Sequence, residues 1–305
     1  MRVSRLAIAF LVAVIVASAC GGSGGGSPSG AAKPNVTIGS TNFPEQLILG
    51  ELYAQVLEAN GYTVTRKFNL GAREIVFPAL ASGQIDLEAD YLATLLSFVN
   101  KTATGSTDPK ATSTALQKEL DAKSVTVLDY APAVDQNGFV VTKATADKYK
   151  LAKLSDVTAV GGQLVLGGPP ECPARPFCQA GLKSTYGINF KDFKALDTGG
   201  SLTVAALKGG QIDVGLLFTS DSTIAVNNFV LLEDDKHLQL SDNIAPVVRN
   251  DLLAKAPSDF KSIINSIAPK LTTAELTAMN KQNDVDKTDP KAIAAAWLKK
   301  MGLVK

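Results

Sequence analysis

The chain has 305 residues, with 30 lysines and arginines against 29 aspartates and glutamates, one histidine and three cysteines. Because the two signs are balanced and neither is gathered into a block, the composition excludes a nucleic-acid partner, which would need a basic surface. The length exceeds what one small core needs and predicts two lobes of ordinary domain size.

The first residues predict export. Two arginines within residues 1–5 precede an apolar run at residues 6–16, and small residues 17–19 come directly before Cys20. The run is too short to span a bilayer as a helix, so we interpret residues 1–19 as a cleaved signal peptide. The junction resembles a bacterial lipobox, with Ala17 where leucine is usual, which implies a lipid on Cys20. The alternative is a secretory signal without a lipid.

The segment after Cys20 is rich in glycine and serine. Such a sequence has nothing to bury, so residues 20–35 are predicted to be a flexible tether. We expect the protein at the extracytoplasmic face of the cell membrane, held there by its lipid alone.

From residue 36 onward strand and helix patterns alternate, which predicts an α/β fold. A first βαβαβ unit is expected from strands at 36–39, 62–68 and 85–87 and helices at 43–59 and 71–80, with Asn42 as a cap-like start. Further strands are expected at 125–128, 139–141 and 164–166, and a helical tail at 258–305. The helical spacing around Trp297 indicates a core residue and not a ligand contact.

One short sequence occurs twice. Residues 79–87 are echoed by residues 206–214, each reading as a helix end, a glycine turn with Gln-Ile-Asp, and a strand. The repeat distance is too long for a solenoid and favours two duplicated lobes. Tyr91 in one copy and Phe218 in the other follow the aspartate by the same number of residues. Since ligands of open α/β sheets bind beyond the carboxyl ends of strands, both rings are expected in one shared cleft. The alternative is two core aromatics that merely end a strand.

Cys172 and Cys178 lie close together in a proline-rich segment. In an exported chain this spacing predicts a disulfide between them. If the loop lies away from the cleft, loss of the bridge should affect function little. Metal binding is the alternative, but a thiolate pair needs two further ligands and the single histidine, His237, stands alone in a charged loop where it is expected to be solvated. No metal and no cofactor is predicted.

Three motifs carry a resemblance to a known family. Residues 39–53, 70–80 and 83–86 resemble the substrate-binding proteins of osmoprotectant ABC importers, and the resemblance covers residues 36 to 305. It implies a two-lobed type II periplasmic-binding-protein fold with a discontinuous first lobe, at 36–130 and 230–305, and a second lobe at 131–229. It also implies glycine betaine or another quaternary ammonium compound as ligand, ABC permease subunits as partners, and a monomer.

The same resemblance implies a site in which tyrosine rings surround a methylated cation, which is attracted to ring faces and cannot be held by hydrogen bonds. The implied ligand contacts are Gln46, Tyr91, Thr94, Asn137, Phe218 and Thr219. Phe218 and Asn137 stand where the family usually has tyrosines, so the cage is expected to be thinned. The position of a fourth ring stays open among Val204, Phe193 and Tyr186.

An enzymatic function is not predicted, whereas two other functions stay open. An enzyme would need a nucleophile with a base, or an acid pair, and the sequence offers neither; Asp86 and Asp213 are expected to have one structural role, capping or interlobe hydrogen bonding, in both lobes. No catalytic residue is predicted. A ligand-sensing lipoprotein without a transport role, or the same fold with an uncharged or aromatic ligand, stays open on these residues.

Overall fold

The computed structural model describes residues 33–305. The predicted signal peptide, the Cys20 anchor and most of the predicted tether lie outside these residues. Within the described range, none of the helices combines the length and the apolar character that crossing a bilayer requires.

The first sheet has five strands in the order β2-β1-β3-β10-β4. Its strands are β1 (Asn35–Gly39), β2 (Thr63–Lys67), β3 (Leu87–Tyr91), β4 (Val125–Val127) and β10 (Ile244–Arg249). β1 pairs in parallel with β2 and β3, whereas β10 runs antiparallel to β3 and β4. The sheet thus takes strands from both ends of the described chain.

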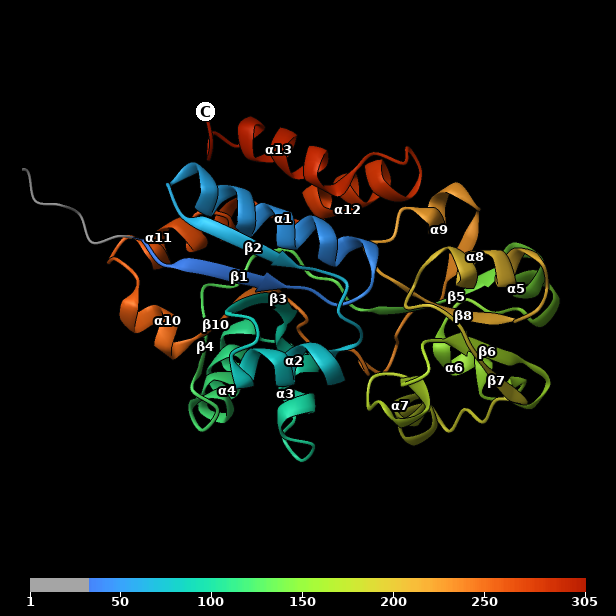
Figure 1. Cartoon of the computed structure of the whole chain (residues 1–305). Coiled ribbons are helices and arrows are strands. Elements are labelled where there is room, and N and C mark those ends of the chain that lie inside the picture. Colours follow the sequence, from blue (N-terminus) through green and yellow to red (C-terminus); the bar gives the residue numbers. More distant parts are fainter. Residues whose placement is uncertain (1–32) are drawn as a thin grey trace, which may run out of the picture. The chain divides into compact units, whose positions relative to one another are not determined.

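Helices cover both faces of this sheet (Figure 1). One face carries α1 (Pro44–Ala59), α11 (Phe260–Asn265), α12 (Thr273–Asp284) and α13 (Pro290–Lys300); the other carries α2 (Arg73–Ser82), α3 (Leu92–Val99) and α4 (Pro109–Asp121). α10 (Asn250–Lys255) and a 3-10 turn at Ala268–Lys270 complete the helical tail. Trp297 is buried in the core under α1, as its helical spacing predicted.

The second sheet also has five strands, in the order β7-β6-β8-β5-β9. These are β5 (Asn137–Thr142), β6 (Val165–Gly168), β7 (Asp192–Ala195), β8 (Val214–Phe218) and β9 (Phe229–Leu231). Short helices surround it: α5 (Lys143–Tyr149), α6 (Leu154–Val157), α7 (Gln179–Gly181), α8 (Ser201–Lys208) and α9 (Thr223–Val226), with 3-10 turns at Gly161–Gln163 and Cys172–Ala174 and a π-helical turn at Leu182–Tyr186. Exposed His237 lies in the turn before β10, as expected.

Two chain segments connect the sheets, one between β4 and β5 and the other between β9 and β10. They pair with each other through an antiparallel bridge between Val134 and Asn243, and the N–H of Asp135 donates to the carbonyl of Asp242 at 3.1 Å. The predicted α/β, two-lobed fold with a discontinuous first lobe is therefore confirmed. The limits of the lobes stay a prediction.

The repeated turn has the same structure in both lobes. Asp86 Oδ2 accepts from the N–H of Thr37 at 2.8 Å, and Asp213 Oδ2 accepts from the N–H of Val165 at 2.9 Å. Each carboxylate thus ties its turn to the neighbouring parallel strand of its own lobe. The shared structural role is as predicted, and of the two forms considered for it these bonds are local and not interlobe.

The strand after the first repeat begins later than predicted, at Leu87, and reaches Tyr91. Residues 84 and 85 form the turn that closes α2, because both of their N–H groups donate to the carbonyl of Ala79. Gly83 makes this possible with a left-handed φ of 84°, which glycine adopts without steric cost.

Candidate functional site

A cleft of about 430 Å³ lies between the two sheets. Its walls come from segments that follow strands: residues 41–46 after β1, Tyr91 at the end of β3, residues 169–178 after β6 and Phe218 at the end of β8. This is the carboxyl edge of each sheet, where open α/β folds bind ligands.

Tyr91 and Phe218 both line this cleft, and a third ring lies between them. The Phe43 centroid is 6.2 Å from that of Tyr91 and 5.1 Å from that of Phe218, with both pairs stacked. The expectation that the equivalent residues of the two lobes face one cleft is thus met, and Phe43 is the ring that joins them.

The sequence pattern does not identify Phe43 as a cleft residue, because it predicts a helix that begins at residue 43. The helix begins at Pro44, and Phe43 is its N-cap residue in an extended conformation. Asn42, the predicted cap, is exposed, and no side-chain hydrogen bond caps this helix. A proline at the first helical position ends the extended segment sharply. That signal in the sequence could have placed Phe43 outside the helix and near the ligand edge of β1.

Two further rings line the cleft, Phe98 and Phe177. Phe98 packs edge-on against Phe77, with centroids 5.8 Å apart. The three positions considered for a fourth ring lie elsewhere among the described residues: Tyr186 and Phe193 pack on one core cluster of the second sheet, and Val204, within α8, packs on another. With five aromatic residues in its lining, the cleft is richer in rings than the sequence predicted.

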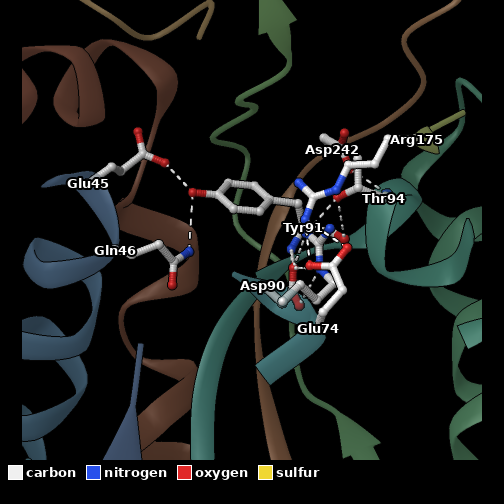
Figure 2. A network of polar contacts seen from close by, with 9 residues as sticks. Glu45, Gln46, Glu74, Asp90, Tyr91, Thr94, Arg175 and Asp242 are labelled. Carbon is white, nitrogen blue, oxygen red and sulfur yellow. Dashed lines mark hydrogen bonds and ion pairs between the residues drawn. The ribbon is translucent and has the colours of Figure 1, made fainter. Parts of the chain in front are cut away.

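The Tyr91 hydroxyl is held by the protein (Figure 2). It donates to Glu45 Oε1 at 2.6 Å and accepts from Gln46 Nε2 at 3.2 Å. Burial, followed by the charge of Glu45, raises the pKa of Tyr91 well above its usual range, so the hydroxyl keeps its proton. Tyr91 therefore offers the cleft its ring and not its hydroxyl.

Glu45 is the centre of a buried polar cluster that joins the lobes. Its Oε2 accepts from Ser220 Oγ at 2.8 Å and from Asn280 Nδ2 at 2.7 Å. Asp135 Oδ1 accepts from the N–H of the same Ser220 at 3.0 Å. Burial raises the pKa of both carboxyl groups, and the charge of Glu45 raises that of Asp135 further. Both carboxyl groups therefore bind a proton more readily than an exposed carboxyl group does.

A second polar network begins at Arg73, near the cleft's other side. Arg73 binds Asp90 with both Nε and Nη2, the shortest contact being 2.6 Å, and its Nη2 donates to Thr94 Oγ1 at 2.8 Å. The N–H of Thr94 donates to Asp242 Oδ1 at 2.8 Å. Thr94 lines the cleft as expected, but both of its polar groups already have protein partners.

The lining carries more acidic than basic side chains. The acidic ones are Glu74, Asp90, Asp135, Glu171 and Asp242, and the basic ones are Arg73, Lys101 and Arg175. Arg73 is paired with Asp90, and Arg175 crosses the cleft to bind Glu74 at 2.8 Å. Of the remaining acidic groups, Asp135 and Asp242 have pKa values raised by burial, so the lining carries no large excess of negative charge at neutral pH.

Of the other predicted contacts, Gln46 and Asn137 line the cleft and Thr219 does not. Thr219 is exposed and its Oγ1 accepts from the N–H of Gln136 at 2.9 Å. It follows Phe218 directly, and consecutive side chains at a strand end point to opposite faces. Asn137 uses its Nδ2 to donate to the Phe177 carbonyl at 2.9 Å.

The predicted disulfide between Cys172 and Cys178 is confirmed. Its loop is part of the cleft wall, so the condition under which the bridge could be lost with little effect is not met. In residues 33–305 no three His, Cys, Asp or Glu side chains are placed to hold a metal together.

Known proteins with similar sequences are described as ligand-binding proteins of transport systems. Residues 34–300 match the family described as OpuAC, the substrate binding domain of ABC-type glycine betaine transport system. A glycine-betaine-binding protein of Pseudomonas aeruginosa is 28% identical over 282 residues, covering 88% of each chain. A carnitine transport binding protein of Listeria monocytogenes is 28% identical over 278 residues, covering 89% of this chain and 88% of its own.

Solved structures agree with the fold. The crystal structure of a glycine betaine/carnitine/choline ABC transporter superposes with a TM-score of 0.69 at 28% identity, covering 88% of this chain and 99% of the other. Lactococcal OpuAC, in its closed conformation with glycine betaine, gives a TM-score of 0.64 at 21% identity over 88% of this chain and 96% of the other.

Proposed function

We propose that this chain, which belongs to the family of substrate-binding domains of ABC-type glycine betaine transport systems, captures a small quaternary ammonium compound outside the cytoplasm and delivers it to the permease of an ABC importer. The observation that carries the proposal is the stack of Phe43 between Tyr91 and Phe218, one ring from each lobe and one from the start of α1, all lining a single cleft. Relatives named for glycine betaine and carnitine support the ligand class.

The chemistry of the walls suits such a ligand. A methylated ammonium has no N–H to donate and is poorly hydrated, so ring faces attract it more effectively than polar groups do. The Tyr91 hydroxyl is bound to Glu45 and Gln46, so Tyr91 presents its ring face to the cleft. The ionised form of Asp242, which also lines the cleft, adds attraction for positive charge.

Calorimetry on the purified protein tests the proposal. Choline, glycine betaine and carnitine are compared with 3,3-dimethylbutanol, which has the shape of choline without its charge. Tyr91→Ala and Phe218→Ala should each raise the Kd for the bound cation about tenfold or more. Tyr91→Phe should keep most of the affinity, because the ring remains and the lost hydroxyl faces Glu45.

Two results would contradict the proposal. One is binding of the neutral compound as tightly as choline, which would favour an uncharged ligand. The other is a protein that binds none of these cations.

The location is part of the proposal. We propose that residues 1–19 are removed and that Cys20 carries a lipid. We also propose that a monomer, with lobes at 36–130 plus 230–305 and at 131–229, acts at the extracytoplasmic face of the cell membrane. Support comes from the apolar run and small residues before Cys20. A Cys20→Ser form should appear in the soluble fraction after cell lysis, whereas equal membrane binding of both forms would refute the anchor.

A further inference from the structure

We propose that the disulfide-closed loop at residues 172–178 is a ligand-binding element, in which Phe177 supplies a further ring to the cation and the Cys172–Cys178 bridge holds that ring in place. The inference rests on the proposed function and deepens it: it assigns Phe177 as an affinity-determining residue and gives the disulfide a role in binding.

The first argument is the placement of the Phe177 ring. Phe177 lines the cleft, is half-buried, and packs on the hydrophobic core of the second sheet. The rings of Phe43, Tyr91 and Phe218 stack on one another, and Phe98 packs on Phe77. Among the described residues no stacking or edge-on ring partner is found for Phe177. Its ring therefore has a supported side and a side open to a ligand.

The second argument is that the backbone of Phe177 is fixed from several directions. Its carbonyl accepts from Asn137 Nδ2 at 2.9 Å and from Gln239 Nε2 at 3.0 Å. The disulfide closes the loop at Cys178, directly after Phe177. A residue whose backbone is held in this way loses little backbone conformational entropy when a ligand binds to its ring.

The third argument is the link to the opposite lobe. Arg175, two residues before Phe177, donates from Nη2 to both oxygens of Glu74, at 2.8 and 3.1 Å. Glu74 lies in the first turn of α2, beside residues that line the other wall. The loop thus spans the cleft, with Phe177 on one wall and an ionic contact on the other.

A different role for these residues is purely structural, with Phe177 as a core side chain and the disulfide as a staple of the folded state. The two roles differ in what they change. A staple changes the free energy of unfolding and leaves the Kd of the folded protein alone, whereas a binding element changes the Kd.

The test compares Phe177→Ala with Phe193→Ala. Phe193 is a half-buried ring that packs on the same core but does not line the cleft. With choline, or whichever cation of the panel binds, Phe177→Ala should raise the Kd about threefold to thirtyfold, and Phe193→Ala should leave it within about twofold. Thermal unfolding of both variants reports their stability separately.

Phe177→Trp supplies a direct readout. An indole keeps a ring face, so affinity should be retained or increased. Its fluorescence should change when the cation is added, against a constant background from Trp297, the one native tryptophan, which is buried in the core of the first sheet. If the role of Phe177 is purely structural, the fluorescence of the Phe177→Trp protein should not change when the cation is added.

The disulfide is tested by a double-mutant cycle. Replacing Cys172 and Cys178 by serine should raise the Kd in the wild-type background, but add little when Phe177 is already alanine, because the bridge acts through that ring. If the serine form does not fold, the Phe177 variants, which keep the disulfide, still test whether the Phe177 ring contributes to ligand binding.

The outcomes separate the two proposals. A Kd that Tyr91→Ala raises and Phe177→Ala leaves unchanged would overturn the role of the loop and leave the proposed function standing. Equal disulfide effects in both backgrounds would overturn the positioning role of the bridge. A wild-type protein that binds none of the cations overturns the proposed function and this inference with it.

Discussion

Asp242 is a buried carboxyl group with a pKa near neutral pH. Burial, with the charge of Asp90, raises its pKa to about 7, against the lowering effects of the Thr94 N–H and Arg73. The charge of Asp242 in turn raises the pKa of Asp135, which lies on the neighbouring connecting segment. A cation in the cleft favours the ionised form of a nearby carboxyl group, so binding and deprotonation assist each other.

We therefore expect the affinity for a quaternary ammonium ion to rise between about pH 6 and about pH 8, by no more than about tenfold per pH unit. Calorimetry at several pH values measures the slope, and Asp242→Asn should flatten it. An Asp242→Asn protein with the wild-type slope would show that another group titrates.

The pair formed by Glu45 and Asp135 has a predictable effect on stability. The pKa of each carboxyl group is raised in the folded protein, so the folded state binds protons more tightly than the unfolded chain. This contribution to stability is complete below about pH 4 and is lost as the pH rises toward the raised values. An asparagine in place of Asp135 would resemble the protonated side chain, keeping an acceptor oxygen for the Ser220 N–H.

Asp135→Asn should accordingly increase the free energy of unfolding at about pH 8 by roughly 1–3 kcal/mol and change it much less near pH 4. Urea unfolding at the two pH values measures both differences. A variant less stable than the wild type at the higher pH would mean that the aspartate is ionised and needed as such.

At the scale of elements, the tightest contact around the disulfide loop is at Gly181, the last residue of α7. A Cβ atom there would lie 1.7 Å from the Pro176 carbonyl oxygen, which is backbone and cannot rotate away. Gly162, in the same lobe, has no atom within 4 Å of a Cβ, and neither glycine has a positive φ. The two positions therefore differ in space and not in backbone conformation.

Gly181→Ala should displace the loop, lower the unfolding midpoint and raise the Kd, whereas Gly162→Ala should change the free energy of unfolding by less than about 0.5 kcal/mol. Calorimetry and thermal unfolding on both variants provide the comparison. An unchanged Kd for a folded Gly181→Ala protein would mean that the loop position does not matter for the ligand.

At the scale of the whole molecule, the ion pair between Glu74 and Arg175 joins the two lobes across the cleft. Its side chains are 40% and 28% exposed, so its equilibrium contribution is expected to be below about 1 kcal/mol. A contact that must break before the lobes separate acts mainly on the rate of ligand release.

Glu74→Gln should speed dissociation of the bound cation about twofold to fivefold in dilute buffer, and the difference should shrink near 1 M salt, where surface charges are screened. Asp147→Asn, which removes an exposed ion pair with Lys143 inside α5, is the control and should leave the rate unchanged. Stopped-flow dissociation measures all three proteins, and equal rates in dilute buffer would remove the ion pair from the release step.

The features of this protein that could be predicted from the sequence depend on residues that are close together in the chain. Alternating strand and helix patterns, the duplicated Gly-Gln-Ile-Asp turn and the closely spaced Cys172 and Cys178 each involve residues near one another in the chain. The equivalence of Tyr91 and Phe218 follows from that duplication, because equal distances from equivalent turns place both rings at the carboxyl ends of their strands.

The tertiary structure alone decided which side chains meet at the cleft. Phe43 contacts rings that are far away in the sequence, and Glu45 and Asp135 both bind Ser220. Phe177 lines the cleft from a loop whose position the sequence did not predict. Burial and the pKa of a carboxyl group depend on partners brought from other elements. No periodicity or local spacing reports such contacts, since they are created only when the two sheets and their connecting segments come together.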